Sequence, residues 1–561
     1  MPSVDTASAI LSSLDALGVT HVLYCPGSRS APFAYALEAG SFGGEVRAVL
    51  DERGAGFAAV GLARTGALPA IVVTSGTAVA ELAPAVLEAS HARLPLLLLT
   101  ADRPGELRGV GASQATDQSG FFGAHVRASI DLEPQEASPF LVGHLARAVA
   151  AACGAPSGAP GPVQINVAFR DPLTPASPAS PSASGDEAGA SFVPRPTRVL
   201  RASVTPERWE DVVGPAAAGL IVAGEGASPR AREWSRAAGF PLFAESASGA
   251  WKGGGVTPFE QSLVASSLGR EIDVVVVTGR PTLSRPIQAL LARPDVRVVV
   301  VDPHSPWVDI SGNASVVVAD LEPAREPISA AQAEWASRVR DAARDAGERI
   351  DSVLAAGSGR TMLDLARAVA ASTSGPLVLG ASNPVRAVDL VCANLAGRRI
   401  HSNRGLAGID GTIATAAGIA RGLGVASGAP APRTVVLLGD LAFFHDASSL
   451  ALAAAEGAPL DIVVADDHGG GIFATLEHGR REHSDLYDRW FGAGQSTDIA
   501  ALAAAYGARY QRLDAGGLRG ALREGADGGG VRVLHVPISR AAGLYATAGS
   551  ASALGLAAGR V

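Results

Sequence analysis

The sequence predicts an α/β protein with three domains, each built around a parallel β-sheet. Its 561 residues are enough for roughly three to four domains of about 150 residues each. Short apolar runs rich in β-branched residues alternate with Ala/Leu-rich helical stretches, a pattern typical of buried parallel strands joined by helices. Two breaks in this pattern divide the runs into three sets.

The predicted strands fall into these three sets along the chain. The first set lies at 22–25, 46–50, 70–74, 96–100 and 163–167. The second set lies at 219–223, 272–278 and 296–301, and the third at 377–380, 434–439, 462–465 and 531–537.

The two breaks set the predicted domain boundaries. Residues 171–196 are rich in Pro, Ser, Ala and Gly, which predicts a linker, and residues 322–360 form a polar helical stretch. We therefore expect domains at 1–180, 198–345 and 356–561, with a linker at 181–197.

Composition excludes several classes of protein. The net charge of −8 argues against a nucleic-acid binder, and no apolar run of about 18 residues suggests an integral membrane segment. The cysteines, Cys25, Cys153 and Cys392, are odd in number and widely spaced, which predicts neither a disulfide framework nor a cysteine pair that binds metal. Acidic residues near the N-terminus argue against a secretory signal, so a cytoplasmic location is expected. Lys252 is the only lysine, so anion binding would fall to arginines, backbone N–H groups and helix N-termini.

Polar clusters follow the predicted strands, and ligands of open α/β sheets bind at the carboxyl ends of strands. The first cluster is Pro26-Gly27-Ser28-Arg29-Ser30, where small residues expose N–H groups and Arg29 offers a fork for a carboxylate or phosphate. An ordinary loop with a solvent-facing arginine is the alternative.

The second cluster, 51–56, places Glu52 between a predicted strand and a glycine-rich helix start. Partial burial there would raise the pKa of the carboxyl and let it share a proton with a nitrogen heterocycle. The alternative is an acid placed at a helix N-terminus because the helix dipole favours it.

Two further clusters lie in the first domain. Residues 74–78, which begin Thr74-Ser75, form a small hydroxyl-rich turn that suits a flat ring or a phosphate, unless Ser75 or Thr77 only caps a helix. Asp102 and Arg103 follow another strand, where they could simply pair with each other.

Asp440 and Asp467 form the most specific signal in the chain. Each follows a predicted strand, and one helix and one strand fit between them, so adjacent strands would bring both carboxylates to one sheet edge. Two carboxylates with backbone oxygens suit a hard divalent cation, and the glycines 469–471 permit close approach of a diphosphate.

Together these segments resemble thiamine-diphosphate enzymes. They resemble most closely the family of 2-succinyl-5-enolpyruvyl-6-hydroxy-3-cyclohexene-1-carboxylate (SEPHCHC) synthases of menaquinone biosynthesis. The similarity covers both outer domains, including 402–411 and 470–473, and is weak in the middle domain. It implies three Rossmann-like domains in a pyruvate-decarboxylase-like architecture, with thiamine diphosphate and Mg²⁺ or Mn²⁺ as cofactors.

The resemblance also implies roles for individual residues. The metal ligands would be Asp440, Asp467 and Gly469, and the catalytic residues Glu52, Arg386 and Arg404. The remaining cofactor contacts would be Pro26, Gly27, Thr74, Ser75, Ser382, Gly439, Leu441, Gly470, Ile472 and Phe473. Substrate contacts would be Ser28, Arg29, Arg103, Ser113, Gln114, Arg285 and Ser382, together with Arg386 and Arg404.

In that family the enzyme is a transferase that decarboxylates 2-oxoglutarate and adds the succinyl unit to isochorismate by a Stetter-like conjugate addition. Both substrates are dicarboxylates, which fits the number of arginines at strand ends. The family arrangement also implies a homodimer or homotetramer with active sites at subunit interfaces.

The sequence departs from the family pattern at Asp467 and His468, where many thiamine-diphosphate enzymes have asparagine. Ser113 stands where the family often has asparagine, and Ser284 where relatives are often basic. Another thiamine-diphosphate decarboxylase or carboligase is the first alternative. A non-catalytic nucleotide-binding protein is the second, although 421–424 lacks the strand-to-helix context of a dinucleotide motif.

Overall fold

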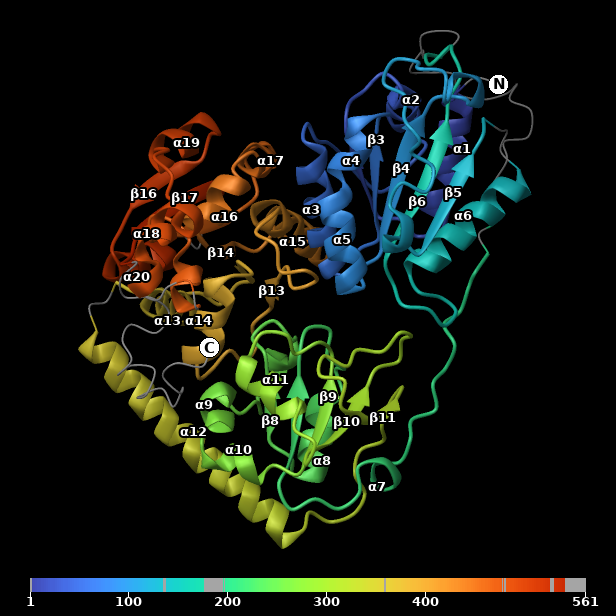
Figure 1. The fold of residues 1–561 in the computed structure, drawn as a ribbon. Helices are drawn as coiled ribbons and strands as arrows, with labels where there is room; N and C mark the ends of the chain where they lie inside the picture. The colour runs from blue at the N-terminus through green and yellow to red at the C-terminus, as the bar shows by residue number, and fades with distance from the viewer. Residues whose placement is uncertain are drawn as a thin grey trace. The chain divides into compact units, whose positions relative to one another are not determined.

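The structure is a computed structural model that describes residues 3–134, 138–175, 195, 197–357, 360–476, 478, 481–524 and 529–539. It contains three β-sheets in which every strand pairing is parallel (Figure 1). The predicted α/β fold with parallel sheets is therefore confirmed.

The sheets follow the three predicted sets of strands. The first, in spatial order, is β2 (Glu45–Ala48), β1 (His21–Tyr24), β3 (Pro69–Val73), β4 (Leu96–Asp102), β6 (Pro162–Ala168) and β5 (Ala128–Leu132). The second is β11 (Ala314–Val318), β10 (Arg297–Val301), β9 (Val274–Thr278), β7 (Gly219–Ala223) and β8 (Leu242–Ala244). The third is β13 (Ile400–Ser402), β12 (Leu377–Leu379), β14 (Thr434–Gly439), β15 (Leu460–Asp466), β17 (Val531–Pro537) and β16 (Arg509–Arg512).

The helices that accompany the first sheet are α1 (Ser3–Ala16), α2 (Ala31–Glu38), α3 (Glu52–Arg64), α4 (Thr77–Glu81), α5 (Ala83–Ala92) and α6 (Pro139–Ala152). Those of the second set are α7 (Trp209–Val212), α8 (Ala231–Ala238), α9 (Glu260–Ala265), α10 (Ser267–Glu271), α11 (Arg285–Leu291) and the long α12 (Ala330–Ala356). The remaining helices are α13 (Met362–Ser372), α14 (Asn383–Val391), α15 (Thr412–Ser427), α16 (Asp440–His445), α17 (Ser449–Ala455), α18 (Ser484–Tyr487), α19 (Ile499–Ala505) and α20 (Ala515–Glu524).

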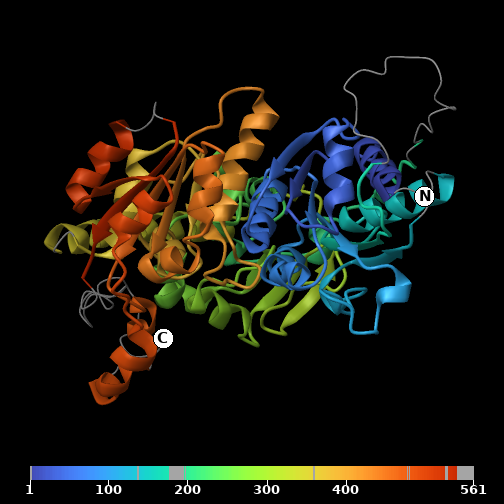
Figure 2. The same ribbon diagram turned by 90° about the horizontal axis from the view of Figure 1, so that it is seen from above.

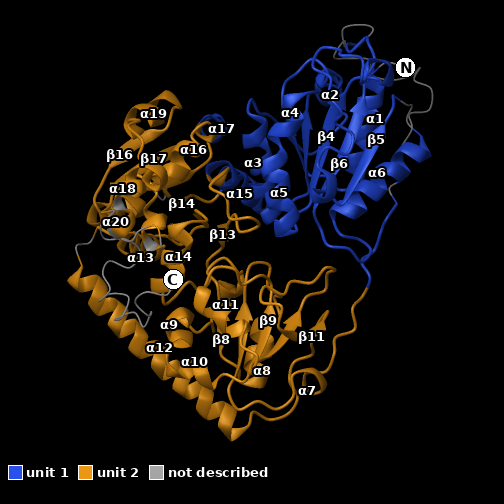
Figure 3. Cartoon of the chain, in the orientation of Figure 1, with its two compact units in different colours: residues 1–202, 413–431, 451–456 blue, residues 203–412, 432–450, 457–561 orange. Residues whose placement is uncertain are grey.

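The chain falls into two compact units (Figure 3). Unit 1 comprises residues 1–202, 413–431 and 451–456, and unit 2 comprises 203–412, 432–450 and 457–561. The domain boundaries predicted from the sequence remain predictions. The predicted linker, 181–197, lies outside the described residues apart from positions 195 and 197.

The sheet of unit 1 is buried on both faces. Val72 and Leu99 pack into a core with α1, α2 and α6, whereas their neighbours Val73 and Leu98 pack into a second core with α3 and α5. Figure 2 shows this unit, coloured blue to cyan, with helices on both sides of the strands. Because successive strand side chains point to opposite faces, near-continuous apolar runs such as 96–99 supply both cores.

Helices α3 and α15 cross within unit 1 with their backbones in contact. A Cβ atom on Gly61 would lie 2.1 Å from the carbonyl oxygen of Thr415, and one on Gly418 would lie 2.0 Å from that of Ala58. Glycine is therefore required at both positions by the close approach of the helices.

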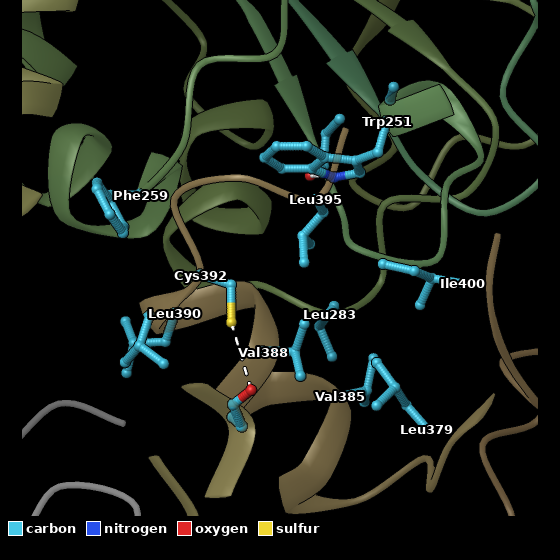
Figure 4. Packing of buried hydrophobic residues seen from close by; sticks show 14 of the residues in the cluster. Trp251, Phe259, Leu283, Leu379, Val385, Val388, Leu390, Cys392, Leu395 and Ile400 are labelled. Carbon is cyan, nitrogen blue, oxygen red and sulfur yellow. Dashed lines mark hydrogen bonds between the residues drawn. The ribbon is translucent and has the colours of Figure 1, made fainter. Parts of the chain in front are cut away.

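Unit 2 contains a core that joins elements of the second and third sheets. Trp251, Phe259 and Leu283 from the second set pack in one cluster with Val385 and Val388 of α14 (Figure 4). This shared core fixes α14 against the loops that follow β8 and β9. It matters for the site because α14 begins at the proposed substrate residues.

Two boundaries and five strands differ from the sequence expectations. Strand β2 ends at Ala48 rather than residue 50, so Leu50 is exposed beyond the strand. The polar stretch predicted to be helical from 322 becomes helical only at Ala330, where Ser329 caps the helix by accepting from the Gln332 N–H. Five strands that the sequence did not predict, β5, β8, β11, β13 and β16, complete the sheets.

Candidate active site

The loops after β1 and β3 meet at the carboxyl end of the first sheet. A Cβ atom on Gly27 would lie 2.3 Å from Cβ of Thr74, so only glycine allows this approach. Ser30 Oγ donates to the carbonyl oxygens of Gly27 and Cys25, at 3.0 and 3.3 Å, which holds the first loop in a tight turn. Pro26 and Ser28 are exposed at its outer side.

Arg29 is buried rather than solvent-facing, which removes the ordinary-loop alternative. The side chain is 4% exposed, and its Nη1 donates to the carbonyl oxygen of Phe169 at 2.7 Å. Burial lowers the pKa of the Arg29 guanidinium, and the nearby charge of Arg103 lowers it further. A buried and a half-buried cation that repel one another form a suitable place for an anion.

Arg103 lies at the end of β4 and reaches a second predicted contact. Its Nη2 donates to the Ser113 carbonyl oxygen at 2.9 Å, while its buried Nε has no hydrogen-bond partner. The expected alternative of an Asp102–Arg103 side-chain pair is wrong. Asp102 forms its ion pair with Arg108 at 3.0 Å, and its contact with Arg103 is a hydrogen bond from the Arg103 backbone N–H.

Glu52 is the first residue of α3 and is half-buried. Asp51 caps this helix by accepting the Gly54 N–H at 3.1 Å, which fixes the position at which Glu52 emerges. Burial raises the pKa of the Glu52 carboxyl, with smaller contributions from the charges of Asp51 and Glu81. The expectation of a partly buried acid with a raised pKa is thus confirmed.

The hydroxyl-rich turn after β3 keeps unused polar atoms. The helix α4 has Gly76 at its N-cap and no side-chain cap, so the capping alternative for Ser75 or Thr77 is wrong. Thr74 Oγ1 and Ser75 Oγ are buried without a hydrogen-bond partner. The exposed Gln114, with φ of 56°, donates from Nε2 to the Ser75 carbonyl oxygen at 2.9 Å. The turn therefore presents two unsatisfied hydroxyls, which a ligand could satisfy.

In unit 2, β14 and β15 are adjacent and deliver Asp440 and Asp467 to the same sheet edge, as predicted. Asp440 is 3% exposed and accepts the N–H groups of Leu441 and Gly469, both at 2.8 Å. Burial and then the Asp467 charge raise the pKa of Asp440 to about 7.

The loop after Asp467 closes tightly around these carboxylates. Gly469 has φ of 131°, and a Cβ atom on Gly471 would lie 1.8 Å from Asp467 Oδ2. Gly470 donates to the Gly492 carbonyl oxygen at 2.6 Å and accepts from Tyr487 Oη at 2.8 Å. Glycines 469 and 471 are thus needed for the backbone path and for the space beside a carboxylate.

Ile472 and Phe473 follow within a short 3₁₀-helix, Gly471–Thr475, and both are half-buried. The rings of Phe473 and Phe491 lie 5.5 Å apart between centroids. An apolar wall therefore stands beside the acidic loop, as the cofactor prediction requires.

A second cluster of unit 2 brings together Ser382, Arg386 and Arg404. Ser382 precedes α14, and Arg386 Nη1 donates to the carbonyl oxygens of Ser382 and Ala381, at 2.8 and 3.1 Å. Arg404 is 6% exposed and donates from Nη1 to the same Ala381 oxygen at 3.1 Å. Two guanidinium groups thus share one acceptor. Arg285, by contrast, is exposed at the start of α11.

The residues fit the implied cofactors. Asp440 and Asp467 are two close carboxylates whose mutual repulsion a divalent cation would relieve, and oxygen ligands are those that Mg²⁺ and Mn²⁺ prefer. No group of three or more His, Cys, Asp or Glu suited to a metal occurs among the described residues, so a backbone oxygen such as that of Gly469 would have to contribute. The unsatisfied hydroxyls of Thr74 and Ser75 and the raised pKa of Glu52 suit a polar heterocycle.

Two family models match the chain. The N-terminal TPP binding domain of thiamine pyrophosphate enzymes matches residues 4–121, and the C-terminal TPP binding domain matches residues 388–536. Fold and site thus define a thiamine-diphosphate enzyme.

Curated relatives identify the family more narrowly. A 2-succinyl-5-enolpyruvyl-6-hydroxy-3-cyclohexene-1-carboxylate synthase of Kineococcus radiotolerans is 42% identical over 91% of both chains. Enzymes of the same name from Nocardioides sp. (40% identity, 95% of both chains) and Mycolicibacterium vanbaalenii (39%, 96% of this chain and 97% of the relative) are also similar. The chain belongs to the SEPHCHC synthase family.

Several residues that support the site were not predicted. Arg108 pairs with Asp102, and Gln118 donates to Asn166 Oδ1 at 2.9 Å in a buried network beneath the Asp102 carboxyl. Thr282 Oγ1 accepts from Arg404 Nη2 at 3.0 Å. No sequence signal marks Gln118 or Thr282, because their partners lie 48 and 122 residues away along the chain.

Proposed function

We propose that this enzyme is a transferase that decarboxylates 2-oxoglutarate and adds the resulting succinyl unit to isochorismate. The product would be SEPHCHC, an intermediate of menaquinone biosynthesis, with release of carbon dioxide. The observation that carries this proposal is the set of buried arginines, Arg29 in unit 1 and Arg404 in unit 2, in a member of this family. Both proposed substrates are dicarboxylates, and buried carboxylates require paired cations.

Thiamine diphosphate, when bound, would supply the electron sink that stabilises the carbanion formed on loss of carbon dioxide. Asp440, Asp467 and the Gly469 carbonyl would hold Mg²⁺ or Mn²⁺ against its diphosphate. The glycine path 469–471 would bring backbone close to the phosphates. Ile472 and Phe473, with Gly439, Leu441 and Gly470, would line the pocket.

Glu52 would share a proton with the cofactor. Its raised pKa would let the carboxyl share a proton with the aminopyrimidine ring of the cofactor, so that the exocyclic nitrogen of that ring could act as a base. Pro26, Gly27, Thr74 and Ser75 would lie along the same ring.

The arginines would bind and orient the substrates. Arg29 and Arg103 would receive carboxylates in unit 1, with Ser28, Ser113 and Gln114 beside them. Arg386 and Arg404 would do so in unit 2, with Ser382. Arg285, which is exposed, would contribute at the outer part of the site.

We further propose a homodimer or homotetramer in the cytoplasm, with active sites at subunit interfaces. No helix in the described ranges is long and apolar enough to span a membrane. Light scattering coupled to gel filtration tests the assembly, and a monomer that is fully active would contradict it.

Substrate competition tests the reaction itself. With thiamine diphosphate and Mg²⁺, the purified enzyme should consume 2-oxoglutarate and leave pyruvate nearly untouched. Glu52→Gln should slow turnover by a factor of about 100 or more, since general acid–base groups contribute on that scale. Preferential turnover of pyruvate would instead indicate another thiamine-diphosphate decarboxylase or carboligase.

A further inference from the structure

The loop that follows β9, residues 279–284, is held rigidly in unit 2. A Cβ atom on Gly224 would lie 2.1 Å from the backbone of Arg280 and Pro281, so this loop and the one after β7 touch through their main chains. Gly279 has φ of 69° and would clash with the Ala227 nitrogen if it carried a side chain. Neither loop can shift without the other.

Two acids anchor the same loop. Glu225 exchanges backbone hydrogen bonds with Arg280, at 2.9 and 3.3 Å, and pairs with its guanidinium at 2.6 Å. Glu245, at the end of β8, accepts the Leu283 N–H at 2.6 Å. The loop that follows β9 is therefore fixed by residues at the ends of β7 and β8 of the same sheet.

The loop makes two contacts with the segment that carries Arg404. Thr282 Oγ1 accepts from Arg404 Nη2 at 3.0 Å, and Arg280 Nη1 donates to the Gly405 carbonyl oxygen at 3.4 Å. With the Ala381 oxygen on Nη1, the Thr282 hydroxyl determines the plane of the Arg404 guanidinium. The third nitrogen, Nε, is buried without a hydrogen-bond partner.

The acids around Arg404 leave its charge available. Glu245, Glu260 and Asp389 are all buried nearby, and Asp389 accepts from the Ser246 N–H and from Gln261 Nε2 at 2.8 and 3.0 Å. Burial raises the pKa of all three carboxyls, followed for Glu245 and Glu260 by the Asp389 charge, and that of Glu245 reaches about 8. Arg404 itself lowers the pKa of Glu245 and Asp389, but its terminal nitrogens donate to the Ala381 carbonyl oxygen and the Thr282 hydroxyl rather than to a carboxylate. A substrate carboxylate would therefore meet an arginine whose terminal nitrogens contact neutral oxygens.

We propose that Thr282 is a positioning residue for Arg404, and that the second sheet influences substrate affinity through this contact. This inference rests on the proposed substrate role of Arg404. It gives the middle part of the chain a function in the reaction, although none of its strands carries the cofactor residues.

The test compares Thr282→Val, which keeps the volume and removes the acceptor, with Thr282→Ser, which keeps the acceptor. The valine variant should raise KM for 2-oxoglutarate or isochorismate roughly tenfold, the factor that corresponds to about 1.4 kcal/mol. Its kcat should change far less, and the serine variant should restore the wild-type KM. Calorimetric titration of thiamine diphosphate with Mg²⁺ should give the same Kd for both variants, because the contact lies on the substrate side.

The outcomes separate the two proposals. If the unaltered enzyme turns over 2-oxoglutarate and the valine variant has the KM of the serine variant, the positioning role is overturned. The same conclusion holds if cofactor Kd and melting temperature change in parallel with KM, because that marks a general structural defect. If the unaltered enzyme does not use 2-oxoglutarate at all, the proposed function fails instead. Should Thr282→Val not fold, Thr282→Ala removes the same acceptor without adding bulk.

Discussion

Replacing Asp440 by asparagine should make the protein without metal and cofactor less sensitive to alkaline pH. The carboxyl lies 3% exposed beside Asp467, and burial with that neighbouring charge raises its pKa to about 7. Since its folded pKa lies above the unfolded value, ionisation opposes folding. The stability gained by keeping Asp440 protonated is fully present below the pKa of the unfolded state, and it is lost as the pH rises through the pKa of the folded state.

The size of the effect follows from the pKa. One pKa unit corresponds to about 1.4 kcal/mol. For a carboxyl with a folded pKa of about 7, raising the pH from about 5.5 to about 8.5 therefore lowers the free energy of unfolding by about 2 kcal/mol. Asp440→Asn removes this dependence. Any constant penalty from the lost Gly469 or Leu441 hydrogen bond cancels in the comparison between the two pH values.

Urea unfolding of both proteins at the two pH values, without Mg²⁺ or thiamine diphosphate, measures the difference. Asp485→Asn, at an exposed position, changes the net charge equally and should behave like wild type. A second arm adds Mg²⁺ and thiamine diphosphate, which should raise the melting temperature of wild type but hardly that of Asp440→Asn. Identical pH dependence in the wild type and Asp440→Asn, or equal stabilisation by the cofactors, would refute the reasoning.

Three more predictions concern stability and reactivity. Gly61→Ala should destabilise the protein by about 1–3 kcal/mol in a melting experiment, because its Cβ would lie 2.1 Å from the Thr415 carbonyl oxygen. The control Gly520→Ala has open space around it and should be neutral or stabilising. Asp461→Ala should lower the free energy of unfolding in urea by about 3–5 kcal/mol, because it leaves Arg433 and Arg532 without their buried carboxylate partner. A loss below about 1 kcal/mol would show that water reaches the two guanidinium groups. Burial raises the pKa of the Cys392 thiol to about 12 and the pKa of the Cys25 thiol above its usual range. Neither thiol should therefore react with a thiol reagent at neutral pH before the protein unfolds. Fast labelling of Cys392 in the folded protein would contradict its place in the core.

The sequence predicted the strands that are buried on both faces and missed most of those at sheet edges. Central strands such as β4 and β14 are continuous apolar runs that stand out from their surroundings. The missed strands are all edge strands: β16 reads Arg-Tyr-Gln-Arg and is mostly exposed, and β8 and β13 have three residues each. An edge strand needs no apolar alternation, since its pairing comes from backbone groups and its neighbour's register.

The candidate site was predictable to the extent that its residues follow strands directly. Asp440 and Asp467 could be placed at one edge because β14 and β15 are close in sequence and adjacent in the sheet. The burial of Arg29 could not be foreseen, because its acceptor on Phe169 lies 140 residues away. The same reason hid the contact between Thr282 and Arg404, which joins the loops of two different sheets.

Carbon dioxide release from 2-oxoglutarate labelled at C1 tests the central claim most directly. With thiamine diphosphate, Mg²⁺ and isochorismate, the enzyme should release one carbon dioxide for each molecule of SEPHCHC detected by mass spectrometry, and Glu52→Gln should release little of either. Sustained release that does not depend on isochorismate, or no release from 2-oxoglutarate, would contradict the proposed reaction.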